Sequence, residues 1–189
     1  MAGIVIDPGD DANEILATIE KRGVKVTAIY NTHGHFDHIG AVHPLQNSLD
    51  VPFALHRGDA ELAASASTQG QMFGLHLPMS PPKVDVWLED DMAIIVGEQK
   101  GKVLHTPGHT QGGVCFLFSD MVFVGDTLFA GSVGRTDLPG GNSRQLIASI
   151  QQKLMSLDDT VKVFPGHGPV TSIGKERKFN PFINYNGTF

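Results

Sequence analysis

The sequence has one cysteine, no long apolar run and no cluster of basic residues. The single cysteine, Cys115, cannot form a disulfide within the chain, and its position in the apolar run VCFLF predicts a buried thiol. No apolar run approaches the roughly 20 residues that a membrane-spanning helix needs. The first residues, MAGIVIDPGDD, lack the basic and apolar regions of a signal peptide. We therefore expect a soluble, cytoplasmic protein with no membrane partner.

The charge balance of the chain is acidic. Lys and Arg number 14 against 20 Asp and Glu, so the formal net charge is −6 at pH 7. Nucleic-acid binding depends on clustered Lys and Arg side chains that neutralise phosphates, and no basic stripe is present. We therefore expect no nucleic-acid partner. A length of 189 residues with 41% hydrophobic residues predicts one domain over residues 1–189 with a proper core.

Short apolar runs alternate with helical patterns along the chain. Strands are expected at residues 3–6, 26–30, 51–56, 85–89, 92–97, 101–106, 112–119, 121–126 and 161–164. The strands from 85 to 126 predict a β-meander, and residues 66–83 are expected to form a loop. Helices are expected after the DPGDD turn, near 39–48, from about residue 58 and at 143–155. Helices around a largely β interior predict an α/β fold of four layers, αββα.

Four predicted strands end in side chains that can bind a metal ion. The segment THGHFDH (32–38) holds three histidines and an aspartate, and TPGHT, VGDT and FPGHG add His109, Asp126 and His167. Such a cluster adds nothing to packing, because each polar group needs a partner or water. Imidazoles and carboxylates suit Zn²⁺, Fe or Mn²⁺, and the absence of cysteine favours a catalytic over a structural site. Histidines that merely cap strand ends are the alternative interpretation.

The spacing within the first motif predicts ligands for two metal ions. His33 and His35 are two positions apart in an extended segment and face the same way, whereas the next two ligands leave on the following turn. We assign one ion to His33, His35 and His109, the second to Asp37, His38 and His167, and the bridging position to Asp126.

We expect two divalent ions that share a water molecule. Zinc is the preferred metal, and iron and manganese are the alternatives. Ions about 3.5–4 Å apart lower the pKa of that water and leave a hydroxide ready to attack an electrophilic carbonyl. Asp37 and Asp126 are the predicted catalytic carboxylates, because losing either one would weaken the metal site and raise the pKa of the shared water.

Four segments of the chain resemble, in the same order, the ligand motifs of the metallo-β-lactamase superfamily: THGHFDHIG, TPGHTQGG, GDTLF and PGHG. The segments GDTLFAGSVGRTDLPGG and FPGHGPVTSIGKERKFNPF are similar to those of the small single-domain type II glyoxalases of bacteria. The resemblance implies the four-layer αββα sandwich and a hydrolase that acts on a thioester, typically S-lactoylglutathione. It further implies that the metal-bridging hydroxide attacks the thioester carbonyl, that the ion of His33, His35 and His109 steadies the oxyanion, and that the other ion accepts the thiolate.

The chain departs from the larger type II glyoxalases at the substrate. Arg135, nine positions after Asp126, stands where they carry a basic residue that helps to hold glutathione, which implies a substrate-binding role. The aromatic residues that accompany it are replaced by Asp137 and Pro169, and a C-terminal helical domain is absent. Glutathione recognition is therefore expected to be loose or absent. The resemblance also implies that the strands preceding GIVIDPG in family members are missing here, by nature or by truncation, and an uncovered sheet edge would invite a homodimer.

Three other functions compete with thioester hydrolysis. A persulfide dioxygenase with one iron shares the GRTD segment, but its last ligand motif tends to read AHDY rather than the GHGP found here. A β-lactamase-like hydrolase is typically exported, and no signal peptide is seen. The non-enzyme alternative is a degenerate metal-binding scaffold, against which the complete set of ligand positions argues.

Overall fold

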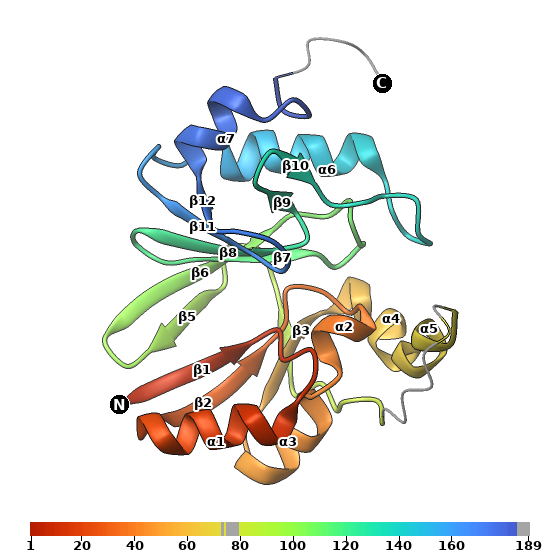
Figure 1. Ribbon diagram of the computed structural model, residues 1–189, viewed down its shortest axis with the longest axis vertical. Helices are drawn as coiled ribbons and strands as arrows, with labels where there is room; N and C mark the ends of the chain where they lie inside the picture. The colour runs from red at the N-terminus through yellow and green to blue at the C-terminus, as the bar shows by residue number, and fades with distance from the viewer. Residues whose placement is uncertain (73, 75–79, 185–189) are drawn as a thin grey trace. The chain divides into compact units, whose positions relative to one another are not determined.

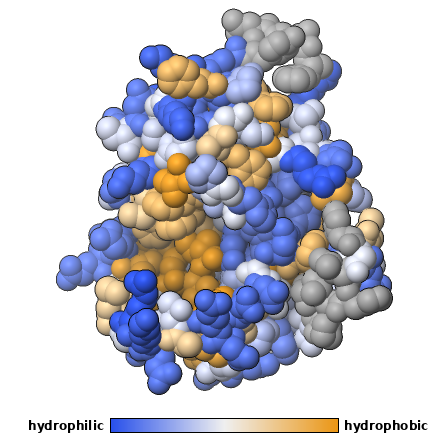
Figure 2. Space-filling view, viewed as in Figure 1, coloured by the Kyte–Doolittle hydropathy of each residue, from blue (hydrophilic) through white to orange (hydrophobic). Residues whose placement is uncertain are grey.

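The computed structural model describes residues 1–72, 74 and 80–184 (Figure 1). They group into two compact units, one made of Met1–Leu88 and Ile95–Gln99 and the other of Glu89–Ile94 and the chain from Lys100 onward. The sequence-based expectation of one domain stays a prediction. Within the described part of the chain, no helix has the length and apolar character needed to cross a membrane. The face in Figure 2 is hydrophilic over much of its area, and apolar residues gather in one patch in the lower left of the view.

The first unit contains a four-stranded sheet whose neighbouring strands all run parallel. In spatial order its strands are β1 (Ala2–Ile6), β2 (Lys25–Tyr30), β3 (Phe53–His56) and β4 (Val86–Leu88). Parallel neighbours require crossover connections. These contain α1 (Ala12–Arg22), α2 (Phe36–Ile39), α3 (Val42–Leu49), the 3₁₀ turn η1 (Arg57–Asp59), α4 (Ala60–Ala64) and α5 (Ala66–Met72).

The core of the first unit lies between the sheet and its helices. Figure 1 shows α1 and α3 beside each other against β1 and β2. The residues that fill this core are fully or almost fully buried: Ile29, Ile39, Val42, Leu45, Phe53 and Leu55. Each such side chain stabilises the fold by about 1.5–3 kcal/mol.

The second unit contains a small hairpin and most of a large mixed sheet, of which the end of β5 and the first residue of β6 lie in the segment Ile95–Gln99 that groups with the first unit. The strands of the large sheet are β5 (Ala93–Val96), β6 (Gln99–His105), β7 (Val114–Leu117), β8 (Met121–Gly125), β11 (Lys162–Pro165) and β12 (Thr171–Ser172). Their spatial order is β12-β11-β8-β7-β6-β5. From β6 to β8 the neighbours are antiparallel, β11 joins β8 in parallel, and β12 pairs antiparallel with β11. The hairpin pairs β9 (Leu128–Phe129) with β10 (Ser132–Val133).

Helices α6 (Ser143–Ser149) and α7 (Ile173–Phe179) complete the second unit. Helix α6 continues into a π-helical turn, η2 (Ile150–Leu154), in which the Met155 N–H donates to the Ile150 carbonyl five residues earlier, at 2.9 Å. Leu146, Ile150 and Leu154 are spaced by four residues, and the wider π turn keeps all three on the buried face. The predicted helix at 143–155 is therefore confirmed, with a π turn that its apolar spacing did not specify.

Two local predictions were wrong. The meander does not begin at residue 85, because β4 pairs in parallel with β3 in the first sheet, whereas β5 belongs to the second. A turn between two strands does not decide which sheet each one joins. Residues 66–72 form helix α5 rather than a loop, and within it Gln69 accepts a hydrogen bond from the Phe36 N–H at 3.3 Å. Of the remaining expected loop, residues 73 and 75–79 lie outside the described residues.

Candidate metal centre

Four strands end directly before the predicted ligands. In the first unit β2 runs into Thr32–His38, and in the second unit β6, β8 and β11 run into the segments that carry His109, Asp126 and His167. The strand ends are held by the sheets, so the loops that follow begin from rigid positions. Within each unit, the candidate ligand residues therefore follow the ends of strands, as the sequence predicted.

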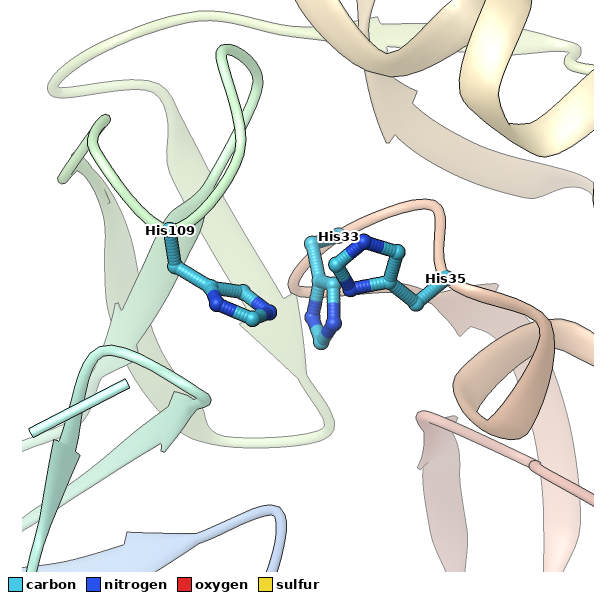
Figure 3. Close-up of side chains that lie close together, drawn as sticks. All are labelled: His33, His35 and His109. Atoms are coloured by element: carbon cyan, nitrogen blue, oxygen red, sulfur yellow. The ribbon is translucent and has the colours of Figure 1, made fainter. Parts of the chain in front are cut away.

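In the first unit, the segment after β2 brings its three histidines together. His33, His35 and His38 are 1%, 9% and 3% exposed, whereas the Asp37 side chain is 41% exposed. The His33 and His35 rings lie edge to face with their centroids 4.9 Å apart (Figure 3). The His38 ring lies 4.1 Å from that of His33, and His38 Nε2 is 3.9 Å from Asp37 Oδ2. All four ligands predicted on this segment therefore gather at one place in the unit.

A carboxylate that the sequence interpretation missed holds this segment from the side of β1. Asp7 follows β1 directly, and its Oδ1 accepts a hydrogen bond from the Thr32 N–H at 2.6 Å. Its Oδ2 accepts from the Thr32 hydroxyl at 2.6 Å and contacts His38 Nδ1 at 3.1 Å. Asp7 ends a strand, as Asp126 does, and this signal could have identified it. Its place in the DPGDD turn instead suggested only a role in the turn.

A second missed carboxylate holds the backbone between His33 and His35. Asp59, 1% exposed at the end of η1, accepts a hydrogen bond from the Gly34 N–H at 3.0 Å. Asn31, which is fully buried, donates from its side-chain amide to the His38 carbonyl at 2.7 Å. Buried polar groups with several such bonds make a segment rigid, so this loop is built to hold side chains in fixed positions.

In the second unit, Asp126 lies beside two histidines. Its Oδ2 atom is 3.7 Å from His109 Nε2 and 3.8 Å from His167 Nε2. The Asp126 and His109 side chains are 14% and 5% exposed, whereas that of His167 is 56% exposed. One carboxylate oxygen therefore faces the Nε2 atoms of two histidines that the sequence interpretation assigns to different metal ions.

The ring of His109 is held by a backbone carbonyl. Its Nδ1 lies 2.7 Å from the carbonyl oxygen of Arg135, which accepts a hydrogen bond from it, so Nε2 carries the lone pair. Figure 3 draws the His109 imidazole on the loop after β6. The contact depends on Gly134, since a Cβ there would lie 1.8 Å from the Asp126 carbonyl oxygen and 3.2 Å from His109 Nδ1. The missing side chain lets the two loops approach closely.

The Arg135 side chain is paired with Asp137. Its Nε and Nη2 atoms donate to the two oxygens of Asp137, both at 2.8 Å, in a bidentate ion pair. The hydrogen bonds from Arg135 lower the pKa of Asp137 to about 2, and the pair raises the pKa of Arg135. Both side chains are more than half exposed. The predicted role of Arg135 in binding substrate stays a prediction, and its carbonyl has a contact that the sequence did not indicate.

The donor groups fit metal ions by both chemistry and distance. Two atoms bound to one ion at about 2.0–2.2 Å, with angles between tetrahedral and trigonal, lie about 3.3–3.8 Å apart. The carboxylate–imidazole separations of 3.7, 3.8 and 3.9 Å are close to this range and longer than hydrogen bonds. Neutral imidazole nitrogens and carboxylate oxygens are suitable ligands for zinc and iron alike. Each unit therefore carries imidazole and carboxylate groups at separations that suit two ligands of one metal ion.

Comparison with known proteins gives consistent matches over almost the whole chain. The family model of the metallo-β-lactamase superfamily matches residues 2–167. The chain is 37% identical over 189 residues to hydroxyacylglutathione hydrolase GloC of Haemophilus influenzae, covering 95% of this chain and 86% of that protein.

Two solved structures are similar to the chain in fold. The structure of BLEG-1, a B3 metallo-β-lactamase, has a TM-score of 0.90 at 34% identity and covers 97% of this chain and 90% of its own. The di-iron-bound form of TTHA1623 has a TM-score of 0.87 at 45% identity, with coverage of 94% and 87%. The predicted metallo-β-lactamase fold is confirmed. Because one of these similar proteins binds two irons, the metal of this chain is not shown, and zinc stays a prediction.

Proposed function

The chain belongs to the metallo-β-lactamase superfamily and is a metallo-hydrolase, and from this premise we propose that it hydrolyses a thioester such as S-lactoylglutathione. The observation that carries the hydrolytic site is Asp126 Oδ2, which faces both His109 Nε2 and His167 Nε2. The substrate class is supported by the similarity to a hydroxyacylglutathione hydrolase over 95% of the chain.

We propose that the seven predicted ligands hold two divalent ions. One ion takes His33, His35 and His109, the other takes Asp37, His38 and His167, and Asp126 bridges. The assignment takes ligands from both units and rests on the order of the motifs and on family membership. Such ions, when bound, lower the pKa of a shared water and polarise the substrate carbonyl.

The protein's own groups prepare the ligands for this task. The Arg135 carbonyl accepts from His109 Nδ1, so the lone pair of His109 lies on Nε2. Asp7 contacts His38 at Nδ1, and the Nε2 atom of His38 faces Asp37. Asp126 supplies carboxylate oxygens, which are suitable ligands for zinc, iron and manganese. Burial of His33, His35 and His38 protects their rings from competing water, so their positions are set before any ion binds.

A cavity beside Arg135 supports the binding of the thiol part of the substrate. Its volume is about 270 Å³, and the residues that line it include Val133, Arg135, Ser143, Ile147 and Phe182. An apolar wall with one cation suits an organic thiol that carries a negative group. Pockets for small molecules are typically lined in this way, with few polar groups.

A β-lactam is the second candidate substrate, because a B3 metallo-β-lactamase matches the fold with a TM-score of 0.90. A β-lactam ring and a thioester both present an electrophilic carbonyl to an activated water. The two substrates differ in the leaving group, since an amide nitrogen requires a proton and a thiolate leaves without one.

One assay separates these functions. The protein, with its metal content measured on the same sample, is given S-lactoylglutathione, a β-lactam and glutathione persulfide in parallel. We expect hydrolysis of the thioester to be the fastest reaction. Dominant β-lactam cleavage, or oxygen consumption with the persulfide, would replace the proposal with another enzyme. Metal-loaded protein that converts none of the three would indicate a binding scaffold.

Substitution of the ligands tests the metal site directly. His109→Ala and Asp126→Ala should lose most of the bound metal and activity, and Asp37→Ala should lower the rate by disabling the second site. His43→Ala, on helix α3 and paired with Asn47 at 3.1 Å, serves as a matched histidine control and should retain both metal and rate. Unchanged activity in Asp126→Ala would contradict the proposed site.

A further inference from the structure

Asp7 forms a hydrogen-bond network that reaches two histidines of the same segment. Its side chain is 12% exposed, and its residue lies at φ 48°, a left-handed conformation that few non-glycine residues adopt. Asp7 Oδ2 contacts both the Thr32 hydroxyl and His38 Nδ1. The Thr32 hydroxyl in turn lies 3.0 Å from His33 Nδ1. The order of the network is therefore His33, Thr32, Asp7, His38.

The chemistry of the four groups decides the direction of each hydrogen bond. An ionised carboxylate only accepts, so the single hydroxyl proton of Thr32 points to Asp7. The same hydroxyl oxygen must then accept from His33 Nδ1–H. His38 Nδ1–H likewise donates to Asp7. A neutral imidazole has only one N–H, so in both rings the lone pair lies on Nε2.

We propose that Asp7 is a positioning residue that sets the tautomers of His33 and His38 together. The inference rests on the proposed function, in which these histidines bind different metal ions. One carboxylate would then prepare ligands of both ions, directly for His38 and through Thr32 for His33. Groups that bind the second nitrogen of a ligand histidine typically change metal affinity by about 10- to 100-fold.

The network also argues against Asp7 as a metal ligand. Potential ligand atoms of Asp7, His33 and His38 lie within 4.8 Å of one another, so these three residues could be taken for a metal cluster. The contacts of 2.6 and 3.1 Å that Asp7 makes are hydrogen bonds, and an ion between these groups would have to replace them. Asp7 therefore acts through the two rings.

Asp7→Asn changes one oxygen to an amide and tests the network with no loss of volume. The Asn Oδ1 must accept from the Thr32 N–H, which places the NH₂ group where Oδ2 was. That group donates to His38 Nδ1 and to the Thr32 hydroxyl, which then donates to His33 Nδ1. Both rings should change to the form with the proton on Nε2, the nitrogen that would bind metal.

The tautomers can be read in the metal-free protein. Nitrogen-15 NMR of the imidazoles at alkaline pH distinguishes a protonated from an unprotonated ring nitrogen. We expect Nδ1–H in both rings of the unsubstituted protein and Nε2–H in both rings of Asp7→Asn. Thr32→Val should free only His33 from the network, and Thr32→Ser should restore it. Asp10→Asn, on the same turn but exposed, should change neither ring.

Zinc titration of the same variants gives the second readout. Asp7→Asn should bind zinc about 10- to 100-fold more weakly at both sites, and Thr32→Val at one site only. Unchanged tautomers in Asp7→Asn, or a bound ion coordinated by Asp7 itself, would overturn the inference. If Asp7→Asn does not fold, Thr32→Val still tests whether Thr32 sets the tautomer of His33. An unchanged His33 tautomer in Thr32→Val would reject the proposed link from Asp7 to His33. Failure of the unsubstituted protein to bind zinc or iron would instead contradict the proposed function, whatever the tautomers.

Discussion

At the residue scale, the candidate ligands differ from ordinary histidines in what holds their second nitrogen. His109 Nδ1 is bonded to a backbone carbonyl, His38 Nδ1 to a carboxylate and His33 Nδ1 to a hydroxyl. Each contact involves Nδ1, which leaves Nε2 as the ligand atom in all three rings. A surface histidine gains nothing from such a constraint. The shared arrangement therefore favours a metal-binding role for the whole set.

The ion pair of Arg135 and Asp137 leads to a prediction on substrate affinity. If Arg135 binds an anionic group, Asp137→Asn should lower KM for S-lactoylglutathione because the guanidinium no longer has a competing partner. Arg135→Ala should raise KM more than it lowers kcat. Steady-state kinetics with both variants, and with Asp120→Asn as an exposed acidic control, measure the effect. If KM changes in neither variant, the proposed role of Arg135 in binding the substrate is wrong.

The pH dependence of this pair has a definite sign. The pKa of Asp137 is lowered to about 2 by hydrogen bonds from Arg135, below its ordinary value of 3.8. The pair therefore contributes its full effect above about pH 4 and loses it as the pH falls through about 2. We expect the KM difference between Asp137→Asn and the unsubstituted protein to stay constant from about pH 5 to pH 9. A difference that changes within this interval would indicate another titrating group.

At the scale of elements, helix α7 is joined to the β9–β10 hairpin by a buried carboxylate. Glu176 is 1% exposed and accepts hydrogen bonds from the Gly131 N–H, the Thr171 hydroxyl and the Asn180 amide at 2.6 to 2.9 Å. Strand β10 leads directly to Arg135, whose carbonyl holds His109. The position of a candidate ligand thus depends on how α7 packs.

Removal of this carboxylate should destabilise the second unit. Glu176→Ala leaves the buried side chains of Thr171 and Asn180 and the Gly131 N–H without this acceptor, so the free energy of unfolding should fall by about 3 kcal/mol or more. Lys175→Ala, exposed on the same helix, should change it by less than about 0.5 kcal/mol. Urea denaturation of both variants measures the difference. A loss below about 1 kcal/mol in Glu176→Ala would show that the network contributes little.

At the scale of the whole molecule, two compact units each carry part of the predicted ligand set. His33, His35, Asp37 and His38 belong to the first unit, and His109, Asp126 and His167 to the second. In the proposed assignment each ion takes ligands from both. An ion that binds the folded protein alone stabilises it, because the unfolded chain does not present the ligands together.

Metal removal should therefore lower the melting temperature. At an ion concentration about 100 times the dissociation constant, binding contributes about 2.7 kcal/mol, which for a chain of this length raises Tm by about 5–10 °C. Thermal melting of chelator-treated protein, with and without added zinc or iron, measures this shift. The His109→Ala variant should show a much smaller shift. Equal shifts in both proteins would indicate that the ions bind elsewhere.

The candidate metal ligands and most of the secondary structure could be named from the sequence, and the assignment of those ligands stays a prediction. Ligand motifs such as THGHFDH are short and demand particular side chains, and apolar runs of four to seven residues mark strands wherever they lie. Strands β1, β2, β3, β8 and β11 were all predicted near their observed bounds. These features depend on local chemistry, which the order of residues specifies directly.

Partners that are distant in the chain were decided only by the tertiary structure. Asp7 meets Thr32 and His38 across 25 and 31 residues, and the carbonyl that holds His109 comes from 26 residues away. Any of the chain's aspartates, or any carbonyl at all, could have filled these roles. Strand β4 likewise joined the sheet of β3 rather than that of β5. Sheet pairing and hydrogen-bond partners depend on which segments the packed fold brings into contact, and no local pattern records that.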